Sequence, residues 1–216
     1  MVMKARLAVA LVLSLALAGC RFVPTSEKQQ QTSANSSEAA DQGFDARVAQ
    51  LWPAKLLPYV NSKAGNFADV MAAIASNPDA AGAKFGFKEK GGSSPWTLLA
   101  KIDGKIVAAN TESRAASLDV DVNGDGKADA QVQIGPVIRG TAIRDSLDFV
   151  NFNDFTNQID FAQFGKAFNT YANEHILKQL PRDALPGRTV SVLGAFPLPQ
   201  GQALPLVTPV QAEIKP

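Results

Sequence analysis

The sequence is poor in the two side chains on which many enzyme and metal sites depend. Its 216 residues contain one histidine and one cysteine, which excludes a Cys/His zinc cluster and a disulfide framework. The single histidine excludes most His-based triads, and no Gly-x-Ser-x-Gly motif is present. The 21 basic and 20 acidic residues give a net charge of +1, without a run of five like charges. We therefore expect no binding to nucleic acid.

The chain also lacks a hydrophobic run long enough to form a permanent membrane span. The run at residues 7–19 has 13 apolar or small residues, where about 20 are needed. Lys4 and Arg6 precede it, which is typical of a secretory signal peptide, here residues 1–19. Leu17-Ala18-Gly19-Cys20 resembles the bacterial lipobox, which predicts cleavage before Cys20 and attachment of fatty acyl chains such as palmitate to it. An ordinary signal peptide that leaves an unmodified thiol is the alternative.

Composition divides the mature chain into four parts. Residues 20–43 are rich in Ser, Thr, Gln and Glu, and they predict a lipidated flexible tether. Residues 44–90 carry apolar side chains at helical spacing and predict a small helical domain. Residues 91–199 change to an alternating pattern and predict a β-barrel domain. Prolines recur in residues 200–216, which predict an extended tail over the surface.

The alternating part predicts five short strands, at residues 96–102, 105–110, 116–122, 128–137 and 187–195. A turn at Asp103-Gly104 is expected to make a hairpin of the first two. Asp160 is expected to cap one long helix, residues 160–180, which Pro181 ends. The fold class expected is therefore α+β, with a small N-terminal helical domain packed on a five-stranded, partly closed barrel.

Residues 121–129, Asp-Val-Asn-Gly-Asp-Gly-Lys-Ala-Asp, have the D-x-[DN]-x-[DN]-G spacing of a calcium loop. Oxygens on alternate side chains converge in such a loop, which predicts Ca²⁺ bound by Asp121, Asn123, Asp125 and Asp129. If the hairpin is symmetric about Asp125, then Asp121 opposes Asp129, and a cation would relieve their repulsion. Position twelve is Val132 rather than Glu. A turn without metal is the alternative, because Asn-Gly and Asp-Gly form turns by themselves.

The histidine belongs to a stripe of residues spaced three and four apart, Phe161, Phe164, Phe168, Tyr171 and His175. This spacing is that of the buried face of an amphipathic helix. We therefore expect His175 to be a partly buried structural residue, and no residue is assigned a catalytic role. A carboxylate pair for glycoside hydrolysis is not excluded by the sequence.

Residues 135–158 form the densest polar stretch and interleave Arg, Asn and Asp with aromatic side chains. Such groups line pockets for carbohydrates or carboxylates. The candidate ligand-binding residues are Arg139, Thr141, Arg144, Asn151, Asn153, Asp154 and Asn157. In the alternative, the Asn and Asp side chains bind the backbone of their own loop while Phe152 and Phe155 fill the core.

Three stretches together resemble a known family. They are the lipobox, residues 44–60 and the segment Ile134-Gly135-Pro136-Val137-Ile138-Arg139-Gly140-Thr141 running into residues 152–158. They resemble the predicted periplasmic lipoproteins catalogued as domain of unknown function 2291. The resemblance implies a helical domain packed on a barrel like that of the oligonucleotide/oligosaccharide-binding (OB) fold, in bacteria and often encoded beside sugar import systems. It implies no activity.

The leading hypothesis is a non-catalytic lipoprotein on the periplasmic side of the bacterial envelope, an accessory or sugar-binding component of an import system. Its expected partners are the membrane, through the lipid anchor, and components of a sugar ABC importer. Arg21 follows the cysteine where an Asp commonly signals retention in the inner membrane, which favours the outer membrane. An enzyme acting on envelope carbohydrate and a purely structural lipoprotein are the alternatives.

Overall fold

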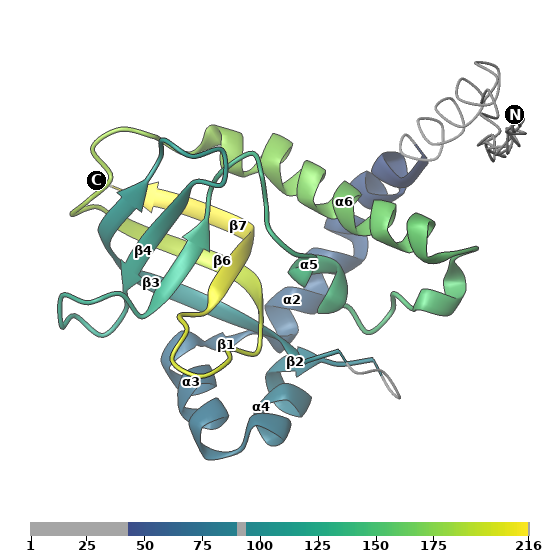
Figure 1. Ribbon diagram of the computed structural model, residues 1–216, viewed down its shortest axis with the longest axis horizontal. Coiled ribbons are helices and arrows are strands. Elements are labelled where there is room, and N and C mark those ends of the chain that lie inside the picture. The colour runs from purple at the N-terminus through teal and green to yellow at the C-terminus, as the bar shows by residue number, and fades with distance from the viewer. Residues whose placement is uncertain (1–42, 90–93, 216) are drawn as a thin grey trace, which may run out of the picture.

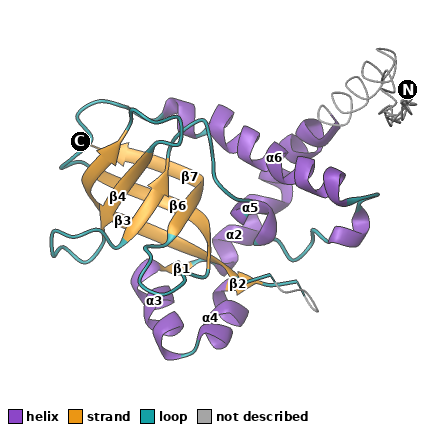
Figure 2. Ribbon diagram, in the orientation of Figure 1, coloured by secondary structure: helices purple, strands orange, loops and turns teal. Residues whose placement is uncertain are grey.

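A computed structural model describes residues 43–89 and 94–215 of the chain. A β-barrel forms the centre of this part, and helices pack against it in two groups (Figures 1 and 2). The helices α3 and α4 lie at one end of the barrel. The N-terminal helical segment, α5 and α6 form a layer along its side. The predicted lipidation site, Cys20, lies outside the described residues.

The N-terminal segment is helical from residue 43 to Lys63. Residues 43–51 lead into a π-helical stretch, Trp52–Leu56, and then into α2, Leu57–Lys63. The buried side chains of this segment recur every four residues, at Val48, Trp52, Leu56 and Val60. The predicted apolar face therefore continues past Pro53, and the wider π turn lies where this proline removes a backbone donor.

A helical hairpin follows, made of α3, Phe67–Ser76, and α4, Pro78–Phe85. Asn77 separates the two helices and caps α4, because its side chain accepts a hydrogen bond from the backbone N–H of Ala80 at 3.0 Å. Two short strands flank the hairpin, β1 at Gly65–Asn66 and β2 at Gly86–Phe87. Both pair with the first long strand of the barrel, which fixes α3 and α4 against it.

Five strands close the barrel: β3 (Thr97–Asn110), β4 (Ser117–Asp121), β5 (Ala130–Gln133), β6 (Thr189–Pro197) and β7 (Leu206–Lys215). Their order is β3-β4-β5-β7-β6, and β6 pairs with β3 to complete the ring. The pairing of β5 with β7 is parallel, and the other pairings in the ring are antiparallel. The long helix α6, Gln158–His175, lies in the chain between β5 and β6. A closed five-stranded barrel with packed helices confirms the expected fold class.

The first two strands expected from the sequence form a single strand in the structure. Residues 97–110 form one strand, with no turn at Asp103-Gly104. The first part of β3 pairs with β6, the last part pairs with β4, and Lys105 pairs with both. Gly104 lies at this change of partner, where a Cβ would approach the carbonyl oxygen of Asp121 to 2.4 Å. The glycine therefore allows a close approach of two strands at the corner of the barrel.

The predicted surface tail also differs, because its residues 206–215 form β7 between β5 and β6. The sequence predicted a surface tail because proline is disfavoured inside a strand. Pro209 lies opposite Gly194, beside a register shift in the pairing of β6 and β7, and such an irregularity is where a strand tolerates proline. The barrel therefore has five strands as expected, but the residues of the tail supply one of them.

Two hydrophobic cores lie on opposite sides of the barrel wall. Along β3, Leu98 and Ala100 belong to the core inside the barrel, while Leu99 between them packs with the helical layer. Successive side chains of a strand point to opposite faces, so the strand is buried on both. The second core also contains Phe164 and Phe168 of α6. The helical layer is thus part of the same packed body as the barrel.

Candidate functional site

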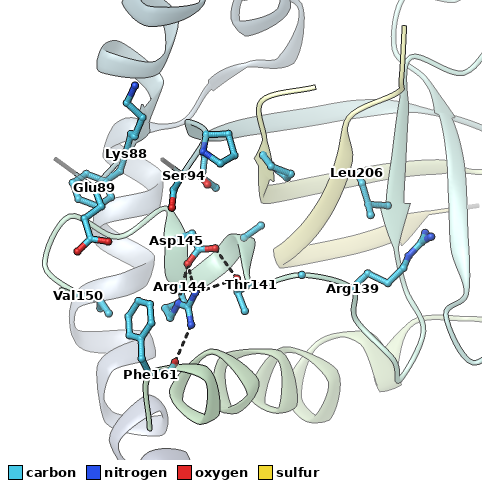
Figure 3. Close-up of a pocket in the computed structure, with 16 residues that line it drawn as sticks. Lys88, Glu89, Ser94, Arg139, Thr141, Arg144, Asp145, Val150, Phe161 and Leu206 are labelled. Carbon is cyan, nitrogen blue, oxygen red and sulfur yellow. Dashed lines mark hydrogen bonds and ion pairs between the residues drawn. The ribbon is translucent and has the colours of Figure 1, made fainter. Parts of the chain in front are cut away.

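A pocket of about 350 Å³ opens between the barrel and the helical layer. Its walls come from the residues around β2, the start of β3, residues 139–145 and α6. Pro197 of β6 and Leu206 of β7 form its barrel side, and Figure 3 shows the residues that line the pocket. Small-molecule sites in proteins occupy about 300–1,000 Å³. The pocket therefore has room for a small solute.

Arg144 of the short helix α5, Ala142–Asp145, is the centre of the polar part (Figure 3). Its Nε donates to Asp145 Oδ1 at 2.8 Å, and Nη2 forms an ion pair with the same oxygen at 2.6 Å. Nη1 donates to the carbonyl oxygen of Phe161 at 2.8 Å, and Nη2 also donates to Thr141 Oγ1 at 3.2 Å. The Thr141 hydroxyl donates to Asp145 Oδ2 at 2.6 Å. The guanidinium is thus held in one place, with 11% of the side chain exposed.

Two residues one turn apart on α6 shape the space around this guanidinium. Its central carbon lies 3.7 Å from the centre of the Phe161 ring, a cation–π contact. A Cβ at Gly165 would lie 2.9 Å from both Arg144 Nη1 and Thr141 Cγ2. Glycine inside a helix costs about 1 kcal/mol relative to alanine. The close packing of Arg144 accounts for a residue that helix propensity disfavours.

Arg139 lies at the other end of the pocket, near Leu206 (Figure 3). Its backbone is held by the buried side chain of Gln133, which accepts from the Arg139 N–H at 2.8 Å. Gln133 Nε2 donates to Thr208 Oγ1 at 2.8 Å and to the Arg139 carbonyl oxygen at 3.2 Å. This amide therefore ties the segment that leads into α5 to the barrel, although the Arg139 side chain itself is exposed.

The predicted ligand-binding residues separate into two groups. Arg139, Thr141 and Arg144 line the pocket, and their role in binding a ligand stays a prediction. The other predicted residues, which do not line it, lie in the turn before α6. They are Asn151, Asn153, Asp154 and Asn157.

The side chains of two of these residues bind the backbone of their own turn. The Asn157 side chain caps α6 and accepts from the N–H groups of Ile159 and Asp160 at 2.8 and 2.9 Å. Asp154 accepts from the Asn151 N–H at 3.3 Å. The helix therefore begins at Gln158 rather than at the expected cap, Asp160. The alternative stated from the sequence, Asn and Asp serving their own loop, describes this turn.

Five polar residues of the pocket were missed by the sequence analysis: Lys88, Glu89, Ser94, Thr97 and Asp145. Asp145 directly follows Arg144 in the polar stretch, and this adjacency could have indicated it. Lys88 and Glu89 reach the site because β2 pairs with the start of β3. That pairing has no local signature in the sequence.

The predicted calcium loop joins β4 and β5. Val120 pairs with Ala130, so the hairpin has the expected symmetry about Asp125. Asp121 accepts from the N–H groups of Gly124 at 2.7 Å and Gly126 at 2.8 Å. Asp129 accepts from the N–H groups of Val122 at 2.7 Å and Asn123 at 3.1 Å. Each acid thus has its own set of donors, which offsets the repulsion without a cation.

These contacts also set the ionisation of Asp121. Burial acts to raise the pKa of its carboxyl group, but the backbone N–H groups of the turn outweigh it, so the pKa lies below its ordinary value. The part of the chain that the structure describes contains no group of three or more His, Cys, Asp or Glu side chains placed to hold a metal ion. Calcium binding by Asp121, Asn123, Asp125 and Asp129 stays a prediction.

His175 ends α6 and is exposed rather than partly buried. Its ring lies over Tyr171, with 4.1 Å between the ring centres, and Tyr171 stacks on Trp52 at 4.6 Å. The aromatic residues of the predicted stripe therefore lie on one face of α6, but His175 at its end is exposed to solvent. His175 does not line the pocket around Arg144.

Comparisons with known proteins place the chain in a family. In the described residues, no helix combines the length and apolar composition needed to cross a membrane. No curated protein matches the sequence. The crystal structure of an OB-fold protein from Thermotoga maritima resembles this one with a TM-score of 0.62. The match covers 80% of this chain and 98% of that chain at 24% identity, and it supports a shared fold. A family model described as predicted periplasmic lipoprotein matches residues 10–213, so the chain belongs to this family, DUF2291.

Proposed function

We propose that the protein is a non-catalytic lipoprotein that binds a small, oxygen-rich solute such as a sugar in the pocket around Arg144. The observation that carries the proposal is the group formed by Arg144, Asp145 and Thr141, which is held in place before any ligand arrives. Groups that are already ordered cost little entropy on binding. A few such groups beside apolar walls are typical of small-molecule sites.

The chemistry of the pocket suits a ligand with several hydroxyl groups. A hydroxyl both donates and accepts hydrogen bonds. The carboxylates of Asp145 and Glu89 can accept from it, and the side chains of Ser94 and Arg139 can donate to it. The apolar walls, which include Leu206, can contact the C–H groups of the same molecule.

The proposal extends to the location and the partner. A binding protein held in the envelope by acyl chains on Cys20 would stay in the compartment that a solute crosses on its way to an importer. We propose components of a sugar ABC importer as that partner, and the outer membrane rather than the inner as the site of anchoring. Growth of a deletion strain on single carbon sources tests the link to import. Normal growth on every sugar that the purified protein binds would contradict it.

Binding is tested with the mature chain produced from residue 21, so that no acyl group is present. Sugars, polyols and small acids are screened for a rise in melting temperature, since a ligand of the native state stabilises it. Thr141→Val and Arg139→Ala should weaken the response to a hit. Asn153→Ala is the matched control, because this exposed residue lies outside the pocket. No hit in any class would favour a purely structural lipoprotein.

A second candidate, an enzyme acting on envelope carbohydrate, is favoured by one observation. Two carboxylates, those of Glu89 and Asp145, line the same pocket, and glycosidases use such a pair. Against this, both oxygens of the Asp145 carboxylate are already bound to Thr141 and Arg144, an arrangement suited to holding a ligand rather than to transferring a proton. Hydrolysis of a screened glycan that is lost in Glu89→Gln would establish the enzyme and overturn the non-catalytic proposal.

A further inference from the structure

The positive charge at the centre of the pocket is already matched by the protein itself. The nitrogens of Arg144 have Asp145, Thr141 and the Phe161 carbonyl oxygen as their partners. The Asp145 carboxylate therefore takes the place on the guanidinium that the carboxylate of an acidic ligand would need. A ligand acid could bind there only by breaking the ion pair of 2.6 Å between Arg144 and Asp145.

The ammonium group of a second cation, Lys88, is directed away from Asp145 and Arg144 (Figure 3). Its Nζ lies 4.0 Å from Asp79 Oδ1 and 5.0 Å from the centre of the Trp96 ring. The same Asp79 oxygen accepts a hydrogen bond from Trp96 Nε1 at 2.7 Å. The charge of Lys88 is thus matched outside the pocket. Among the described residues of the lining, this leaves the exposed Arg139 as the cation that can reach a ligand.

The two carboxylates of the pocket, in contrast, keep the capacity to bind a ligand. Asp145 accepts from Arg144 at Oδ1 and from Thr141 at Oδ2, but a carboxylate has about four lone-pair sites, and 38% of this side chain is exposed. Glu89 is half-buried and forms no ion pair within the described part of the chain. Both carboxylates lie at the end of the pocket opposite to Arg139 (Figure 3). This end therefore offers more acceptors than donors and carries a net negative charge.

We propose that the solute bound in this pocket carries an ammonium group beside its hydroxyl groups, as an amino sugar does, and that Glu89 and Asp145 bind this group. The inference rests on the proposed function, because it names the class of solute that the same pocket selects. An ammonium group supplies three donors and a positive charge, which match the available acceptors and the unpaired charge of Glu89. A sugar acid is repelled at this end, and at the other end it meets an exposed arginine, whose charge is screened by solvent.

The test compares matched forms of one sugar that differ in charge. Calorimetry of the purified lipoprotein, in an uncharged detergent without a sugar headgroup, measures the affinity for glucosamine, glucose and glucuronate, and for the corresponding forms of galactose. The titrations are made at about pH 6, where the amine is protonated and the sugar acid is ionised. The amino form should bind about fivefold more tightly than the neutral form, the effect of an exposed ion pair near the upper end of its usual range. The acid should bind most weakly, and added salt should reduce the advantage of the amine.

Two variants show whether the carboxylate in the pocket causes the preference. Glu89→Gln keeps the size of the side chain and removes its charge, so the ratio of the affinities for the amino and neutral forms should fall to about one. Glu112→Gln is the matched control, because this exposed residue lies outside the pocket and its substitution should leave the ratio as in the wild type.

Three results would overturn the inference while the pocket remains a solute site. They are equal affinity for the amino and neutral forms, tighter binding of the acid than of the neutral form, and an advantage of the amine that persists in Glu89→Gln. If no form of either sugar binds, the proposed function is contradicted together with the inference.

Discussion

Replacing Gly165 with alanine tests the account of the site, because helix propensity and packing predict opposite signs. Alanine inside an exposed helix is about 1 kcal/mol more favourable than glycine. Here its Cβ would come within 2.9 Å of Arg144 Nη1 and Thr141 Cγ2, and overpacking of this kind costs about 1–3 kcal/mol. Moving the guanidinium also breaks its hydrogen bond to the Phe161 carbonyl oxygen, a further loss of about 1.5 kcal/mol or more for a charged donor. We therefore expect a net destabilisation of about 1.5–3.5 kcal/mol.

The assay is urea unfolding of the mature chain produced from residue 21. The urea concentrations at the midpoint are compared between variants whose unfolding free energy has the same dependence on urea concentration. The control is the same substitution in an Arg144→Ala background. With the guanidinium absent, the cost of Gly165→Ala should fall by about 1 kcal/mol or more, which is the coupling expected of side chains in contact. A more stable Gly165→Ala protein, or equal costs in both backgrounds, would refute the packing argument.

Four other predictions follow from the described contacts and from the leader sequence. Because the pKa of Asp121 is lowered, this carboxylate stabilises the fold at pH values above its pKa in the unfolded chain, and the stabilisation is lost as the pH falls through its pKa in the folded protein. Asp121→Asn should therefore make stability less dependent on pH in acid unfolding. Calcium, if bound, should raise the melting temperature of the wild type and not that of Asp121→Asn. Burial first, and then the charge of Asp148, raises the pKa of Tyr59 to about 12, so stability should fall between about pH 10 and 12. An absorbance titration should show one tyrosine ionising near pH 12, and Tyr59→Phe should remove that ionisation. Metabolic labelling with a fatty acid should mark the wild type and not Cys20→Ser. Deletion of residues 206–216 should abolish cooperative unfolding, because β7 is paired on both sides.

The sequence predicts best those features that local chemistry determines. The spacing of Val48, Trp52 and Leu56 gives the buried helical face, and Asn77-Pro78 marks the break between α3 and α4. The symmetric turn about Asp125 gives the register of β4 and β5. In each case the signal and the structure lie within a few residues of each other.

Features that depend on distant pairing were not predicted. Asp103-Gly104 has the chemistry of a hairpin turn, but the pairing of β3 with β6 keeps this segment extended. Pro209 disfavours a strand, but a register shift beside Gly194 accommodates it. The same limit applies to the site, where Arg139 and Arg144 were identified from their polar stretch, while Lys88 reaches the pocket only through the pairing of β2.

The affinity of the best solute from the screen, measured by calorimetry in matched variants, tests the central claim most directly. If the pocket around Arg144 binds it, Thr141→Val should weaken binding about tenfold, because the hydroxyl that holds Asp145 and Arg144 in place is lost; a tenfold change corresponds to about 1.4 kcal/mol. Asn153→Ala, outside the pocket, should bind as the wild type does. Unchanged affinity in Thr141→Val and Arg139→Ala would contradict the assignment of the site.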